Sequence, residues 1–453
     1  ACRLHPRQAN MGITPTTKAQ ISGHKFLTRR LEHGLVLGDI RMIHDPLATR
    51  NRAHVFSLAA TVLICLGALA MAVFKPAIDP GDAAIIQAES GQLYVRIDNK
   101  LHPVANLASA RLIVGEAADI HTGSDTVLKN LPKAIPIGIV DAPGLIAPPD
   151  TATQKLLSHA CHTTTKPVNR LDTAPSQITV IMQETGANPT DTNQTTPTFQ
   201  RLAVDHAIVG LVDQAEWLVT ADGRRLLPPA DTPDGRNIRH RLGIAPTTPR
   251  WSPPPQVFSA IAEKPPAAIP TGILEILRIP GANNPQLWAR TADGVVHLTP
   301  IQADILLDAG IHMRDGTATE LGANPDSKTL TDLPLPDRVP NWVDPTAQPL
   351  CVAEHGEVET APLIEGKPAW GEAVALAGKA VATHFVGPGW AVGVDTGSGI
   401  HVVSAHGLRH QVESQETAAA LGISHFYSIR WDVLRLLPSG TTLSKQQALQ
   451  PLY

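Results

Sequence analysis

Most of the residue patterns from which enzyme and metal sites are built are absent from this sequence of 453 residues. It has four cysteines and no CxxC or paired Cys/His spacing, which argues against a structural metal site. It has no HExxH and no GxSxG motif, so zinc-protease and serine-hydrolase chemistry is not indicated. A P-loop also fails, because Lys367 and Lys379, which each follow a glycine, precede Pro368 and Ala380 instead of Ser or Thr. We therefore expect no catalytic residues, no metal and no cofactor.

Histidine is more abundant, at 19 residues, but it is scattered along the chain. Three of them, His401, His406 and His410, lie close together in the sequence. They could form a metal site or simply make a surface hairpin polar. The second interpretation is favoured, because no carboxylate stands nearby at ligand spacing.

One stretch lacks charge altogether, from Val55 to Phe74. Twenty residues at the helical rise span about 30 Å, which is the thickness of the hydrocarbon core of a bilayer. A cleaved signal peptide is the alternative, but the basic region before this run is too long and no A-x-A site follows it. The pattern predicts an uncleaved membrane-spanning helix over 55–74.

The charges on the two sides of this helix differ in sign. Residues 1–54 carry nine Lys or Arg against three acidic residues, whereas the residues after the helix carry 28 against 38. A basic flank predicts a cytoplasmic N-terminus, with 75–453 on the outer side. Cys2 would then be cytosolic, Cys65 would lie in the membrane, and Cys161 and Cys351 would be outside, where they form either one disulfide or two buried free thiols. The disulfide is the favoured alternative.

A short pattern recurs four times in the outer part: an alternating strand, a turn and a second short strand, at 93–104, 217–228, 287–300 and 401–412. Asp-Gly and similar pairs predict type I′ hairpin turns, in which both central residues have positive φ. The predicted turns are Asp98-Asn99, Asp222-Gly223, Asp293-Gly294 and His406-Gly407. A helix-like stretch follows each hairpin, at 106–115, 235–244, 301–311 and 415–423.

These patterns predict an α+β protein of three parts. A cytosolic arm over 1–54 precedes the membrane helix, and the outer domain holds four hairpin-plus-helix repeats around a central portion. The repeats lie near 91–115, 215–244, 286–311 and 400–423, and the interval 312–386, which includes Cys351, is a candidate for part of the centre.

The cytosolic arm contains a candidate amphipathic helix over 23–43. Phe26 lies among its apolar residues, with Arg29 and Arg30 between them. These three residues are candidates for contact with a cytosolic partner or with anionic lipid headgroups. A solvated helix beside the membrane is an equal alternative.

Several segments resemble the EccB family, which are membrane components of the mycobacterial ESX, or type VII, secretion systems. SGHKFLTRR at 22–30 is similar to the family's SG-x-x-F-x-x-RR pattern, and LYVRIDNKLHPVANLASARLI at 93–113 is similar to its first repeat. GIVDAP at 138–143 and LRLLPSGTTLSKQQAL at 434–449 resemble two further blocks. The surroundings of both outer cysteines depart from the family, and the first ten residues match nothing in it, which makes Met11 a candidate natural start.

The resemblance implies a structural role in a secretion complex of the inner membrane. EccB-like proteins cross this membrane once, associate with each other through their periplasmic domains, and assemble with an EccC-type motor ATPase, EccD, EccE and the mycosin protease. Their fold is four repeats around a central domain held by a disulfide. We expect this role and no nucleic-acid partner. The alternatives are an ATPase subunit of the same system, for which ATP would be the cofactor, and a module that binds the cell envelope.

Overall fold

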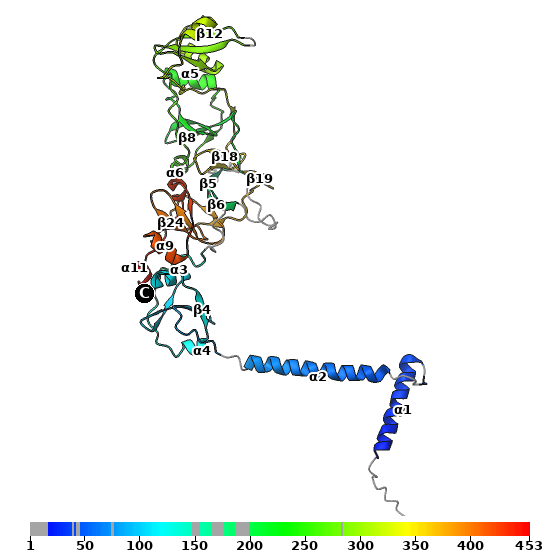
Figure 1. Ribbon diagram of the computed structural model, residues 1–453. Helices are drawn as coiled ribbons and strands as arrows, with labels where there is room; N and C mark the ends of the chain where they lie inside the picture. The colour runs from blue at the N-terminus through cyan, green and yellow to red at the C-terminus, as the bar shows by residue number, and fades with distance from the viewer. Residues whose placement is uncertain are drawn as a thin grey trace, which may run out of the picture. The chain divides into compact units, whose positions relative to one another are not determined.

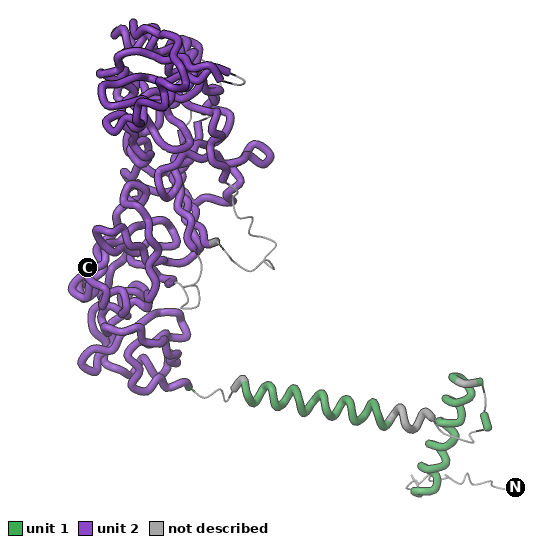
Figure 2. The backbone as a smooth tube through the Cα atoms, turned by 45° about the horizontal axis from the view of Figure 1, so that its top comes forward, with its two compact units in different colours: residues 1–77 green, residues 78–453 purple. Residues whose placement is uncertain are grey.

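The computed structural model describes residues 17–38, 40–41, 46–73, 77–146, 155–164, 176–185, 199–281 and 284–453. The chain divides into two compact units, residues 1–77 and 78–453, which Figure 2 shows in different colours. Cys2, Met11 and Phe74, on which predictions fall, lie outside the described residues.

Unit 1 contains two helices. Helix α1 (Lys18–Leu37) begins where the Thr17 side chain accepts from the Gln20 amide and the Gln20 side chain accepts from the Thr17 amide, so both helix-end groups are satisfied. It ends at Gly38, whose left-handed conformation (φ 71°) stops the helix. The prediction of a helix over 23–43 was therefore wrong at both ends, because it overlooked the Thr17 capping box and the glycine stop.

Helix α2 (Pro46–Val73) carries the uncharged run. Its segment from Arg52 to Met71 is long and apolar enough to cross a membrane, with a mean hydropathy of 2.1, and none of it is buried within the protein. The helix begins at Pro46, which suits the first turn because proline has no amide hydrogen to leave unpaired there.

Unit 2 is a mixed α/β structure that contains four small sheets (Figure 1). Sheet 1 comprises β1 (Ile85–Ala88), β2 (Leu93–Ile97), β3 (Lys100–Val104) and β4 (Ile120–Gly123). Sheet 2 comprises β8 (His206–Val212), β9 (Ala215–Thr220), β10 (Gly223–Leu226) and β11 (Arg250–Trp251), with β16 (Asn341–Trp342) added beside β8. Sheet 3 comprises β12 (Ile273–Ile279), β13 (Gln286–Thr291), β14 (Val295–Leu298) and β15 (Met313–Asp315). Sheet 4 comprises β23 (Val392–Asp395), β24 (Ile400–Val403), β25 (Arg409–Gln411) and β26 (Phe426–Ser428).

The four sheets share one topology. Three strands form an antiparallel meander, a helix follows the third strand, and the fourth strand returns parallel to the first. These helices are α3 (Leu107–Val114), α5 (Pro233–Leu242), α7 (Pro300–Asp308) and α9 (Gln415–Leu421). A second, shorter helix follows each fourth strand: α4 (Asp125–Leu128), α6 (Pro255–Phe258), α8 (Ala318–Ala323) and α10 (Trp431–Leu434). The chain then bridges back to the third strand of its own sheet, as at Leu101 and Lys133.

The turns between the second and third strands are of more than one kind. Asp98 and Asn99 both have positive φ (49° and 61°), as a type I′ turn requires. In the other three turns only the glycine has positive φ, so the prediction of type I′ turns was wrong at Asp222-Gly223, Asp293-Gly294 and His406-Gly407. At the first of these the turn residues are Ala221 and Asp222, because Gly223 already pairs with Thr220 in the ladder.

The sheets are packed in two pairs. Sheets 1 and 4 share a core, in which Val95 packs near Val402 and α3 packs against α9. Sheets 2 and 3 share another, in which Ile238 and Leu306 are buried and α5 packs against α7. In each pair, a shared buried core and packed helices hold the two sheets together, in addition to the chain that connects them.

A seven-stranded sheet, here called the central sheet, is formed by the segments of the chain that lie between sheets 1 and 2 and between sheets 3 and 4. Its strand order is β21 (Val374–Ala375), β22 (His384–Val386), β6 (Ser176–Thr185), β5 (Lys155–Thr164), β17 (Leu350–Val352), β18 (Val358–Thr360) and β7 (Gln200–Arg201). The assignment of all of 312–386 to the centre needs correction, because β15 and α8 belong to sheet 3. The pairing of β15 with β12 is non-local, which sequence patterning alone does not reveal.

Candidate functional site: the disulfide-linked central sheet

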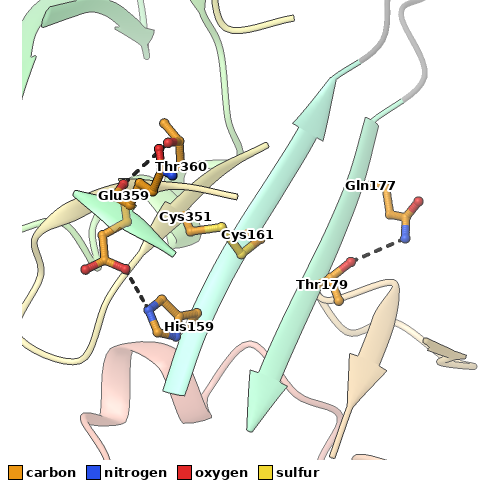
Figure 3. The surroundings of a disulfide bond; sticks show 8 residues. His159, Cys161, Gln177, Thr179, Cys351, Glu359 and Thr360 are labelled. Carbon is orange, nitrogen blue, oxygen red and sulfur yellow. Dashed lines mark hydrogen bonds and ion pairs between the residues drawn. A yellow bond between two sulfur atoms is a disulfide. The ribbon is translucent and has the colours of Figure 1, made fainter. Parts of the chain in front are cut away.

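A disulfide joins Cys161 in β5 to Cys351 in β17 (Figure 3). The two residues face each other directly in the antiparallel ladder, and both are fully buried. The predicted disulfide is thereby confirmed. It connects two cysteines that are separated by 190 residues in the sequence. Strand β5 comes before sheets 2 and 3 in the chain, and β17 comes after them.

The disulfide lies in a small apolar core on one side of the central sheet. Ile181 of β6, Val386 of β22 and Ala361 pack around it, together with Trp370, which is 4% exposed. The indole of Trp370 therefore anchors the segment between β18 and β21 onto the disulfide.

A polar contact between His159 of β5 and Glu359 of β18 lies close to the disulfide (Figure 3). His159 Nε2 lies 2.9 Å from a Glu359 carboxylate oxygen, and the imidazole stacks on Phe199 with ring centroids 3.7 Å apart. These residues line a cavity of about 570 Å³, together with Lys155 and Arg201. The cavity has carboxylates and cations on its wall, but among the described residues no group of His, Cys, Asp and Glu side chains is arranged to hold a metal ion.

A second buried histidine connects the central sheet to sheet 2. Trp251 Nε1 of β11 donates to His162 Nδ1 of β5 (2.8 Å), so the imidazole proton is on Nε2, which donates to Ser176 Oγ of β6 (2.7 Å). Burial lowers the pKa of His162 to about 4, because the charged imidazolium would lose its hydration. His162 is therefore a neutral structural group at neutral pH.

The central sheet also shares its larger core with sheets 2 and 4. Val180 of β6, Val219 of β9 and Val403 of β24 belong to this one cluster of buried residues. Across the same junction, Arg430 Nη1 donates to the Ala260 carbonyl (2.9 Å). The two pairs of sheets thus meet at the central sheet, which makes it the junction of unit 2.

The residues predicted from sequence do not gather into one site. Among the predicted turn residues, Asp293 accepts hydrogen bonds from the Thr291 and Ser327 hydroxyls, which keep the pKa of its carboxyl well below the usual range. The amides of Lys328 and Thr329 also donate to it, and together these bonds fix the turn of sheet 3. Phe26, Arg29 and Arg30 lie on α1 in the other unit, where they are exposed.

The three clustered histidines have separate surroundings. His401 lies beside the Trp431 ring (5.5 Å between centroids), and His410 is buried with Nδ1 2.8 Å from the Thr441 carbonyl oxygen. The glycines of the two Gly-Lys pairs, Gly366 and Gly378, have positive φ and do not lead into a helix. Sequence reasoning missed the contact of His159 with Glu359 and that of His162 with Trp251. These partners are up to 200 residues away in the sequence, so no local motif reveals them.

Residues 13–451 match the protein family described as "Type VII secretion system ESX-1, transport TM domain B". The chain belongs to the EccB family. It is 28% identical to the ESX-1 secretion system ATPase EccB1 of Mycobacterium tuberculosis, over 97% of this chain and 95% of that protein. It is also 28% identical to the ESX-5 secretion system ATPase EccB5 of Mycobacterium marinum, over 98% and 95%.

Solved structures show the same fold. The chain is similar to a chain in the structure of an intact ESX-5 inner membrane complex, with a TM-score of 0.65, 25% identity, and coverage of 98% of this chain and 97% of that one. A structure of an EccB3 dimer from the ESX-3 core complex matches 81% of this chain and all of that one, with a TM-score of 0.65 and 21% identity. The protein is therefore an EccB component of an ESX inner membrane complex with a periplasmic assembly.

Proposed function

We propose that this EccB protein is a structural subunit that supports protein export across the inner membrane. It assembles through unit 2, which carries four copies of one structural repeat around the central sheet. The observation that carries the proposal is the junction itself. A disulfide, a shared core and cross-sheet hydrogen bonds join the two pairs of sheets, which is a design for a stiff scaffold and not for a moving catalytic cleft.

We further propose that unit 1 is cytoplasmic and unit 2 periplasmic. The nine basic residues before the membrane helix favour the cytoplasmic side, and the disulfide favours an oxidising compartment for unit 2. Cysteines introduced singly at Ala19 and at Leu274 test this orientation, in a chain whose Cys2 and Cys65 are serine. A membrane-impermeant maleimide should label intact spheroplasts at position 274 only, and lysed ones at both. Labelling at position 19 alone would reverse the orientation.

The proposed partners are a second copy of this chain, the EccC-type motor ATPase, EccD, EccE, the mycosin protease and the lipid bilayer. The similar EccB3 chain is found as a dimer, which supports pairing here. Phe26, Arg29 and Arg30 of α1 are proposed to contact a cytosolic subunit or the headgroups. Native mass measurement of the complex, purified by an affinity tag on this chain, tests which of these proposed protein partners are present. Recovery of this protein alone, with no motor ATPase beside it, would contradict the proposal.

ATP hydrolysis is the second candidate function, because the curated relatives are named ATPases. It would need a phosphate-binding arrangement other than the P-loop, and it would make ATP the cofactor. Turnover by the full chain that persists at constant specific activity through repeated purification would establish it. Binding to cell-wall material in a pull-down would similarly support an envelope-binding module.

A further inference from the structure

A short hairpin stands apart from every larger sheet of unit 2. It consists of β19 (Leu363–Ile364) and β20 (Lys367–Pro368), which pair only with each other in the described part of the chain (Figure 1). Its turn is Glu365-Gly366, in which both residues have positive φ, as in a type I′ turn. An isolated two-stranded hairpin is only marginally stable in water, so its definite shape needs an explanation.

The base of this hairpin is fixed to the disulfide core. Ala361 before it and Trp370 after it are both buried in the cluster around Cys161 and Cys351. The Ala369 amide donates to the Pro362 carbonyl (3.1 Å) and closes the base. The disulfide core thus holds the base of the hairpin in place.

The exposed end of the hairpin is apolar where solvent would favour polar residues. Leu363 is 41% exposed and Ile364 is 59% exposed, and the turn adds one carboxylate (Glu365) and one ammonium group (Lys367), so it carries no net charge. Anchored apolar residues on a protruding element are typical of a protein contact. A neutral tip also allows two copies to approach without repulsion.

The backbone of the hairpin offers one usable edge. With a two-residue turn, Ile364 and Lys367 form the hydrogen-bonded pair, so the polar groups of Leu363 and Pro368 point outward. Pro368 has no amide hydrogen, which blocks the outer edge of β20 as an antiparallel partner. The outer edge of β19 keeps both the Leu363 amide and its carbonyl.

We propose that β19 pairs in antiparallel fashion with β19 of a second copy of this chain, across a twofold axis at Leu363. An antiparallel pairing of a strand with itself satisfies a twofold axis, as an isologous dimer requires. The Leu363 amide of each copy donates to the Leu363 carbonyl of the other, and the exposed Leu363 side chains of the two copies pack side by side on one face of the joined hairpins. This inference rests on the proposed self-association and names a surface for it.

Two single variants at Leu363 test the pairing in the full chain, purified in detergent. Leu363→Pro removes the edge amide but keeps an apolar side chain, whereas Leu363→Val keeps both. We expect the proline variant to weaken dimerisation at least about tenfold, because two hydrogen bonds are lost, and the valine variant to change it little. Resistance of the buried Cys161–Cys351 disulfide to reduction by dithiothreitol, without denaturant, serves as the folding check.

Cross-linking gives a second, independent readout. Cysteine at Leu363 should join two copies under a short thiol-specific cross-linker, in a chain whose Cys2 and Cys65 are serine. Cysteine at Val204, which is 76% exposed in the same unit, should not. If the wild-type chain is a dimer and both Leu363 variants leave it intact, the proposed contact through β19 is wrong, although the self-association stands. A monomeric wild-type chain would overturn the self-association itself, and loss of another subunit in place of the second copy would assign the hairpin to that subunit.

Discussion

At the scale of single residues, the buried histidines carry the chemistry that connects the parts of unit 2. His162 accepts from Trp251 and donates to Ser176. Ser176 lies on the next strand of the chain, but Trp251 lies 89 residues away in the sequence. None of them belongs to a local motif. Sequence reasoning could therefore find the cysteines, which can be counted and paired, but not this histidine, whose role depends on its neighbours in space.

The stability of unit 2 should decrease when the pH falls below 6.5. The pKa of His162 is about 4 in the folded chain and near 6.5 when unfolded, so the unfolded chain binds the extra proton between these values. Protonation therefore favours unfolding, by up to about 3 kcal/mol at pH 4. Urea unfolding of the full chain in detergent at pH 7, 5.5 and 4.5 measures the effect.

His162→Gln is the matched control for this pH dependence. Glutamine can accept from Trp251 and donate to Ser176, but it does not titrate in this range. The variant should lose less stability than the wild type between pH 7 and 4.5, even though it starts lower. Equal slopes in the two proteins would show that other groups cause the pH dependence.

At the scale of single elements, each of the four equivalent helices begins at a polar side chain. These N-caps are Asn106, Thr232, Thr299 and Ser414, and each accepts from the backbone amide three residues later. Such local signals are readable in the sequence, as are the glycines that end three of the helices. The first and fourth strands of each sheet are not readable in this way, because their parallel pairing joins residues some thirty or more positions apart, as at Ile85 and Ile120.

Asn106 should be the costliest of these caps to remove. Its side-chain oxygen accepts from the Ser109 amide (2.9 Å), and its amide donates to the Ile139 carbonyl (2.7 Å) in a buried position. Asn106→Ala loses both bonds and leaves the Ile139 carbonyl without this donor, so we expect a cost of roughly 2 kcal/mol. Asn106→Ser restores the cap acceptor, and should recover about half of it. Denaturant unfolding of both variants measures the difference, and equal losses would show that the cap itself contributes nothing.

At the scale of the whole molecule, the disulfide closes a long loop that contains sheets 2 and 3. The number of cysteines predicted this bond, since only two of the four follow the membrane helix in the sequence. The path of the central sheet could not be predicted, because its strands come from four separate stretches of the chain, at 155–185, 200–201, 350–360 and 374–386. Short strands such as β17 and β22 have too few residues to show a period.

Removal of the disulfide should loosen the junction and leave the sheet pairs folded. The cross-link closes a loop of 190 residues, for which the chain-entropy model gives an upper figure of roughly 5 kcal/mol. The cores of sheets 1 and 4 and of sheets 2 and 3 do not include either cysteine. Cys161→Ala combined with Cys351→Ala should therefore increase amide hydrogen exchange most in β5, β17 and the segment around Trp370. Amides of α5 and α7 should keep their protection, because their core is separate. A uniform rise in exchange across unit 2 would instead mean that all four sheets and the central sheet unfold as one cooperative unit.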